Sequence, residues 1–131
     1  MIAYTEIREQ SVYVMEFDPA SPGPGRSIKV SPSQVQEPVW SPVDNMLYYR
    51  SMDGKRIFSA PISRNPLSAG RETQRMDNLS LTNWGWLSYD IDPDGKRFIM
   101  QLSDEPASDT MILVVVQNWF EELTQKFGAG K

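Results

Sequence analysis

The sequence predicts an all-β fold made of antiparallel four-stranded units, followed by one short C-terminal α-helix. Short runs of residues alternate between the two sides of a strand and are rich in β-branched and aromatic residues. Stretches rich in Pro, Gly, Asp, Asn and Ser separate these runs, as expected where the chain reverses. Parts of the sequence also repeat, at a shorter spacing of 45 and a longer spacing of 51 positions.

The expected strands are short and closely spaced along the whole chain. They cover residues 2–7, 11–17, 26–31, 37–41, 46–51, 56–62, 71–76, 88–92, 96–102 and 111–116. The strongest hairpin signals are "MDGK" (52–55) and "PDGK" (93–96), because Asp-Gly suits a tight turn with positive φ. The stretch "SRNPLSAG" (63–70) is expected to be a plain reversal, and Trp40 is expected to lie in the core.

The C-terminal helix is predicted over about residues 118–127. Asn118 can cap its N-terminus, and Glu121 follows three residues later as in a capping box. Trp119, Phe120, Leu123 and Phe127 then fall largely along one side, and Gly128 ends the helix.

The composition bounds the function. The chain has 131 residues, a net charge of −4, no cysteine and no histidine. One domain, 1–131, is expected, with no general nucleic-acid binding, no thiolate or imidazole chemistry and no cofactor. The longest apolar run, "MILVVV" (111–116), is too short to span a membrane, and the start of the chain shows no export signal, so a cytoplasmic protein without membrane association is expected.

The internal repeat indicates the architecture. "WSPVDNMLYY" (40–49) aligns with "IDPDGKRFIM" (91–100), and "VYVMEF" (12–17) aligns with "IFSAPI" (57–62). Each repeat unit spans about 45–50 residues and four strands, which is the size of a propeller blade. The blade-like units are expected at about 1–35, 36–78 and 86–117, so that the chain is a partial β-propeller of about two and a half blades.

Two long stretches carry a family resemblance. "EPVWSPVDNMLYYRSMDGKRIFSAPIS" and "YDIDPDGKRFIM…ILVVVQNWFEEL" resemble the WD40-like, TolB-type β-propeller repeats of bacterial proteins. They look most like the last blades of propellers attached to bacterial serine/threonine kinases. The resemblance implies a non-catalytic protein-interaction or binding module. The turn "SPVDN" departs from the Ser-Pro-Asp-Gly of such repeats, and Asp44 or Asn45 is expected to adopt a left-handed conformation there.

The predicted strands leave the end blades incomplete. The first unit begins without its innermost strand and the last ends without its outermost strand. Exposed edges of this kind are templates for pairing with another copy, so a homo-oligomer, most simply a dimer, is expected. The alternative is a monomer in which the terminal helix and "NLSLTNWGWL" (78–87) cover the edges.

The stretch "YDIDPDGKRF" (89–98) contains D-x-D-x-D-G, the opening of a calcium-binding loop. Counting from Asp90, the twelfth position is Gln101, which cannot supply the bidentate carboxylate that an EF-hand needs. We therefore expect a strand-connecting turn and no metal, with Asp92 or Asp94 organising the turn through backbone hydrogen bonds.

The candidate ligand-binding residues are Trp84, Trp86 and Asp90. The alternate tryptophans in "TNWGWLSYD" can form a stacking platform for a glycan or a peptide, although they can equally fill the gap between blades. Two functions other than binding remain open. Glu37 and Asp90 could act as the paired carboxylates of a small carbohydrate-active enzyme, or the chain could be a truncated propeller fragment without retained activity.

Overall fold

The computed structural model describes residues 1–21, 23–32, 34–83, 87–103 and 111–117. The chain forms two compact units, Met1–Leu79 and Ser80–Lys131. The described residues form strands and turns, and none of them forms a helix long and apolar enough to cross a membrane. The predicted helix at about 118–127 lies outside the described residues.

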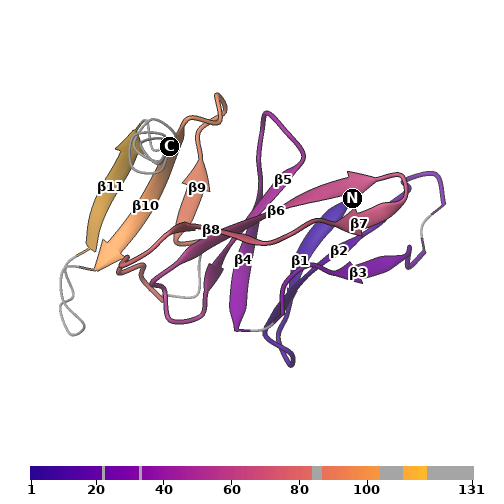
Figure 1. The fold of residues 1–131 in the computed structure, drawn as a ribbon, viewed down its shortest axis with the longest axis horizontal. Coiled ribbons are helices and arrows are strands. Elements are labelled where there is room, and N and C mark those ends of the chain that lie inside the picture. Colours follow the sequence, from indigo (N-terminus) through magenta and orange to yellow (C-terminus); the bar gives the residue numbers. More distant parts are fainter. Residues whose placement is uncertain (22, 33, 84–86, 104–110, 118–131) are drawn as a thin grey trace, which may run out of the picture. The chain divides into compact units, whose positions relative to one another are not determined.

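All the sheets are antiparallel, which confirms the all-β prediction (Figure 1). The first unit holds a three-stranded sheet in the order β1-β2-β3 and a five-stranded sheet in the order β4-β5-β6-β7, where β8 also pairs with β6. The second unit holds a three-stranded sheet in the order β11-β10-β9. The strands are β1 (Ile2–Glu6), β2 (Ser11–Met15), β3 (Ser27–Lys29), β4 (Val35–Trp40), β5 (Met46–Ser51), β6 (Ile57–Arg64), β7 (Leu67–Ala69), β8 (Thr73–Met76), β9 (Tyr89–Ile91), β10 (Arg97–Ser103) and β11 (Met111–Gln117).

Each predicted strand is present, with ends shifted by a few residues. The chain reverses within 63–70 as expected, but it also forms a strand that was not predicted, because β6 continues to Arg64 and the chain returns as β7, antiparallel to β6. Leu67 of β7 is buried in the core, so pairing with β6 removes its side chain from water while satisfying the backbone. Trp40, expected in the core, is half-buried and packs against it.

The shorter repeat spacing is visible in the strand register of the first unit. Tyr4 lies opposite Tyr13 in the β1–β2 pair, and their counterparts one repeat further along, Tyr49 and Phe58, lie opposite each other in the β5–β6 pair. The same holds for the third strand: Tyr13 faces Lys29, as Phe58 faces Gln74. The aromatic rings stack in both places, with centroids 5.8 and 6.1 Å apart. The strands of the two sheets of this unit therefore pair in the same register.

The longer repeat spacing relates the β4–β5 pair to the β9–β10 pair. Trp40 pairs with Leu47 in the first, and their counterparts one repeat later, Ile91 and Phe98, pair in the second. The segment before β9 also pairs with β10, through an isolated antiparallel bridge between Leu81 and Leu102. Buried Tyr89 and Phe98 stack with centroids 6.3 Å apart and contribute to the core of the second unit.

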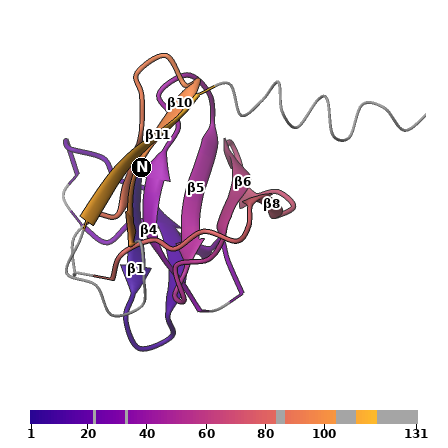
Figure 2. The same cartoon turned by 90° about the vertical axis from the view of Figure 1, so that its left-hand side faces the viewer.

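The core of the first unit lies between its two sheets. Strand β1 packs against β4, and the two run side by side in Figures 1 and 2. Strand β2 also contacts β4. The buried aliphatic and aromatic side chains alternate along the strands, which directs one face of each sheet inward. They are Val12, Val14, Val35, Leu47, Tyr49, Ala60, Ile62 and Leu67.

The two Asp-Gly turns have the same construction. The N–H of Gly54 bonds to the carbonyl of Ser51 at 3.0 Å, and that of Gly95 bonds to the carbonyl of Asp92 at 2.8 Å. Both glycines have positive φ, 70° and 73°. Asp92 and Asp94 accept N–H groups from Asp94 and Lys96, which confirms that they organise the turn. Their carboxylates also pair with Arg97.

The turn "SPVDN" closes differently from the expectation. Neither Asp44 nor Asn45 has a positive φ, so the predicted left-handed residue is wrong. The Ser41 hydroxyl instead accepts the N–H groups of Val43 and Asp44, and the Asp44 carboxylate accepts that of Met46. These side-chain acceptors satisfy the turn without a strained residue.

Gly25 and Gly70 are 45 positions apart, the shorter repeat spacing, and at each of them a neighbouring segment leaves no room for a side chain. A Cβ on Gly25 would lie 2.1 Å from the carbonyl oxygen of Glu16, and one on Gly70 would lie 2.6 Å from Cγ of Pro61. Glu16 and Pro61 are themselves equivalent at the same spacing. Both sheets of the first unit thus require glycine at the same place.

We predict that Gly25→Ala lowers the free energy of unfolding by about 2 kcal/mol, because the new methyl group meets backbone that cannot move aside. Urea unfolding followed by circular dichroism measures the loss. Gly23→Ala is the matched control, since a Cβ at Gly23 meets nothing within 4 Å. Equal stability of the two variants would contradict this account of the strand packing.

Candidate binding cleft

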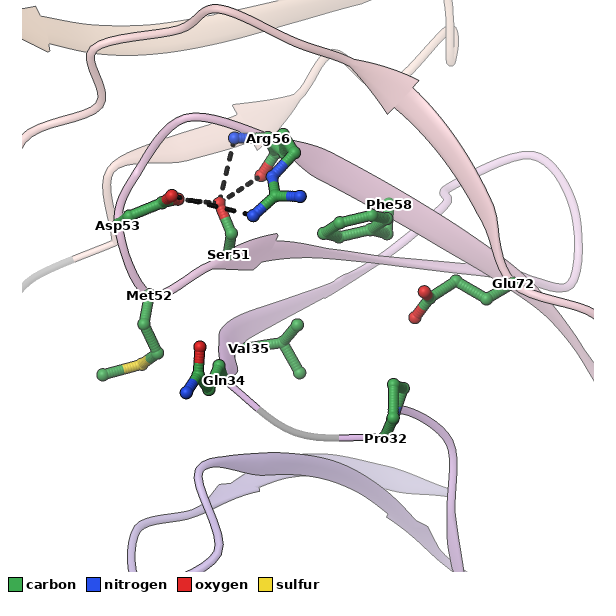
Figure 3. Close-up of a pocket in the computed structure, with 9 residues that line it drawn as sticks. All are labelled: Pro32, Gln34, Val35, Ser51, Met52, Asp53, Arg56, Phe58 and Glu72. Carbon is green, nitrogen blue, oxygen red and sulfur yellow. Dashed lines mark hydrogen bonds and ion pairs between the residues drawn. The ribbon is translucent and has the colours of Figure 1, made fainter.

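A small open cleft lies in the first unit at the turn between β5 and β6. Its volume is about 190 Å³. Apolar side chains form its middle, and charged or polar ones stand around them. The lining residues are Pro32, Gln34, Val35, Ser51, Met52, Asp53, Arg56, Phe58 and Glu72 (Figure 3).

One end of the cleft is a closed hydrogen-bond network built on the Asp-Gly turn. The Ser51 hydroxyl donates to Asp53 at 2.5 Å and accepts the N–H of Arg56 at 3.0 Å. Arg56 forms an ion pair with Asp53 at 3.7 Å and also lies over the ring of Phe58. The Ser51 hydrogen bond, followed by that from the Lys55 N–H, lowers the pKa of Asp53 below its ordinary value of 3.8. This end therefore carries an acid and a base that neutralise each other.

The other end of the cleft carries a carboxylate held by a buried phenol. Tyr49 is fully buried, and its hydroxyl donates to Oε2 of Glu72 at 2.7 Å. Burial, and after it the hydrogen bond to Glu72, raises the pKa of Tyr49 above its ordinary value of 10.0. The hydroxyl therefore stays protonated and orients Glu72. Figure 3 shows Glu72 on the opposite side of the cleft from Asp53, with Val35 and Phe58 between them.

The loop before β4 forms a further wall and is tied to both sheets. The N–H of Met52 donates to the carbonyl of Gln34 at 2.8 Å. The N–H of Val35 donates to the carbonyl of Gln10 at 3.0 Å. Gln34 itself has a φ of 58°, an uncommon conformation for a residue with a side chain. These bonds hold Val35 at the floor of the cleft.

A buried ion pair joins β4 and β5. Arg50 of β5 is only 1% exposed, and its guanidinium donates to Oε1 of Glu37 at 2.5 Å. It also donates to the carbonyl of Ser51 at 3.2 Å and, with the Gln36 amide oxygen turned toward it, to Gln36. Glu37 reaches Arg50 because β4 bulges between Gln36 and Val39, with Glu37 at a φ of 54°. The bulge thus supplies the counter-charge that a buried arginine needs.

Of the three predicted ligand-binding residues, Asp90 alone lies among the residues that the structure describes. Trp84 and Trp86 lie outside the described residues, so the stacking platform stays a prediction. Asp90 is an exposed residue of β9, and its carboxylate accepts the neighbouring N–H of Ile91 at 2.8 Å. Glu37 belongs to the first unit and Asp90 to the second, and the carboxylate of Glu37 is engaged by Arg50. Among the described residues, acidic side chains form no group of three that could hold a metal ion.

Sequence reasoning did not find the cleft. The turns "SPSQ" (31–34) and "SMDG" (51–54) are both visible as reversals, but nothing in their spacing says that they face each other. The one signal available is the shared Asp-Gly-Lys-Arg of the two turns: Ser51 stands three residues before Gly54, where the other turn has Asp92 before Gly95, and the arginine that follows has different partners. Comparison of the chain with family models, curated proteins and solved structures gives no match. The resemblance to WD40-like, TolB-type propellers therefore stays a prediction.

We predict that Ser51→Ala raises the pKa of Asp53 toward 3.8, because the hydroxyl is the main cause of its lowering. A carboxylate with a lowered pKa stabilises the fold above its unfolded pKa, and that contribution is lost as the pH falls through the folded value. In the variant the loss should therefore begin at a higher pH. NMR titration of the Asp53 carboxyl carbon measures the shift; an unchanged pKa would contradict the assignment.

A double-mutant cycle tests the ion pair between Arg50 and Glu37. We predict that Glu37→Gln destabilises the protein by about 3 kcal/mol, because it removes the carboxylate that pairs with the buried guanidinium of Arg50. Adding Arg50→Met to this variant should restore most of the loss, since no buried charge then remains. Urea unfolding of the two single variants and the double variant gives the coupling. A loss for Glu37→Gln no larger than that of a plain surface substitution would contradict the prediction.

Proposed function

We propose that this chain is a non-catalytic binding and scaffolding module built from propeller-type blades, and that it self-associates. The observation that carries the proposal is the repeated register of the strands. The β1-β2-β3 register recurs in β5-β6-β8 at the shorter repeat spacing, and that of β4–β5 recurs in β9–β10 at the longer one. Four-stranded antiparallel repeats of this length are typical of propeller blades.

Self-association is supported by the strand edges. Among the described residues, β1 forms a hydrogen-bonded ladder with one strand, β2, and β11 forms one with β10 alone. An unpaired edge presents backbone donors and acceptors that a strand of another copy can satisfy. Ile2 of β1 is 41% exposed and adds an apolar side chain to this edge. A symmetric dimer is the simplest closed arrangement of identical chains.

The composition supports binding rather than catalysis. The chain contains no cysteine and no histidine, and Glu37, one of the two carboxylates considered for hydrolysis, serves as the counter-ion of a buried arginine. A glycan or a protein segment remains the proposed class of ligand for Trp84, Trp86 and Asp90. Screening the full chain against a glycan panel, with Asp90→Asn as the comparison, separates binding from hydrolysis.

Light scattering on a size-exclusion column over a tenfold concentration range tests the self-association. We predict twice the chain mass for the unaltered protein. Ile2→Lys should weaken the dimer at least tenfold, because a lysine on an edge strand opposes pairing. Ile7→Lys is the matched control: Ile7 is 84% exposed but lies in the turn after β1. A monomer at every concentration, or equal effects of the two variants, would show the edge model to be wrong.

A further inference from the structure

We propose that the cleft beside the β5–β6 turn receives a lysine-type side chain of a partner protein, with its ammonium group at Glu72 and its aliphatic stem over Val35 and Phe58. This rests on the proposed function as a binding module but not on the self-association. It concerns residues other than Trp84, Trp86 and Asp90.

The charge of the cleft favours a cation. Three charged side chains line it: Asp53, Arg56 and Glu72. Asp53 and Arg56 form an ion pair at 3.7 Å, so their charges offset each other. Within the described residues, the Glu72 carboxylate has no basic group within 4.0 Å. The net charge is therefore −1 and is located at Glu72, which makes a positive group the complementary ligand.

The shape of the cleft favours a side chain rather than a larger molecule. Its volume of about 190 Å³ lies below the range of roughly 300–1,000 Å³ that pockets for drug-sized ligands occupy. The wall between its two ends is apolar, formed by Val35 and Phe58 with Pro32 and Met52 nearby. A lysine stem has four methylene groups and covers apolar surface while its charged end stays at a polar rim.

The hydrogen bonding at Glu72 favours lysine over arginine. Oε2 already accepts the hydroxyl of Tyr49 at 2.7 Å, and Tyr49 is fully buried and stays protonated. A bidentate arginine fork would have to share or displace this bond. An ammonium group needs a single oxygen, and Figure 3 shows the Glu72 carboxylate pointing into the cleft. The cleft thus offers a single carboxylate acceptor beside the apolar side chains of Val35 and Phe58.

The test is an NMR titration of the 15N-labelled full chain with N-acetyl-lysine methylamide. Shifts should concentrate at the amides of Val35, Ser51 and Glu72. The norleucine analogue keeps the aliphatic stem but lacks the charge, and the arginine analogue carries a planar cation. Both should bind at least tenfold more weakly. Equal binding of the norleucine analogue, or shifts spread over the whole protein, would overturn the proposal.

Two variants locate the contact. Glu72→Gln removes the charge but keeps an oxygen for Tyr49, and it should weaken binding of the lysine probe about tenfold. Glu16→Gln makes the same change at an exposed position of the first unit outside the cleft, and it should bind as the unaltered protein does. Equal losses in both variants would show a general charge effect and overturn the site. Thermal unfolding checks that Glu72→Gln is folded. If it is not, the proposal is tested by comparing the binding of the lysine, norleucine and arginine analogues to the unaltered protein.

A final comparison separates the sources of the cation. Butylamine carries the ammonium and the stem without a peptide backbone, whereas a short lysine-containing peptide adds backbone groups that can meet the loop at Gln34. Tighter binding of the peptide supports a protein partner. Equal binding of butylamine would assign the cleft to free amines instead and overturn the protein-partner proposal. Because Ile2 and Ile7 do not line the cleft, failure here and failure of the dimer are distinguishable.

Discussion

A guanidinium buried near the end of β5 constrains much of the larger unit. Arg50 is 1% exposed, and a charge at that depth must be paired and hydrogen-bonded. Its counter-ion, Glu37, lies on the neighbouring strand and reaches it only through a bulge with a left-handed residue. The pair therefore determines where β4 departs from regular pairing. Because Arg50 also donates to the carbonyl of Ser51, the same constraint extends to the turn that forms the cleft.

Two turns with the same backbone construction differ in their side-chain contacts. The two Asp-Gly turns share their backbone hydrogen bonds and their positive-φ glycines. In one turn Arg97 is engaged by two acids, Asp92 and Asp94, whereas serine replaces the first acid in the other. Arg56 then pairs with Asp53 alone and also lies over Phe58. A single exchange of residue type thus turns a closed ion cluster into one wall of a cleft.

Much of the fold could be predicted from local patterns. Strand alternation and turn residues depend on neighbours in sequence, so the strands from β1 to β6 and from β8 to β11 were expected within a few residues. Both repeat spacings were visible as sequence similarity and returned as strand register. Strand β7 was not expected, because the burial of Leu67 that favours it depends on the opposite sheet. The conformation of "SPVDN" was missed because a serine hydroxyl satisfied the turn instead of a left-handed residue.

The sequence by itself determined the all-β class, the order and spacing of the strands, and the turns at Gly54 and Gly95. These follow from alternation and from backbone chemistry over a few residues. Only the tertiary structure decided that Gly25 must lack a side chain, since its constraint is the carbonyl oxygen of Glu16, nine residues earlier in the chain. It also decided that Glu37 is a counter-ion and that Glu72 lines the cleft. Such roles depend on distances between segments far apart along the chain, which residue spacing does not encode.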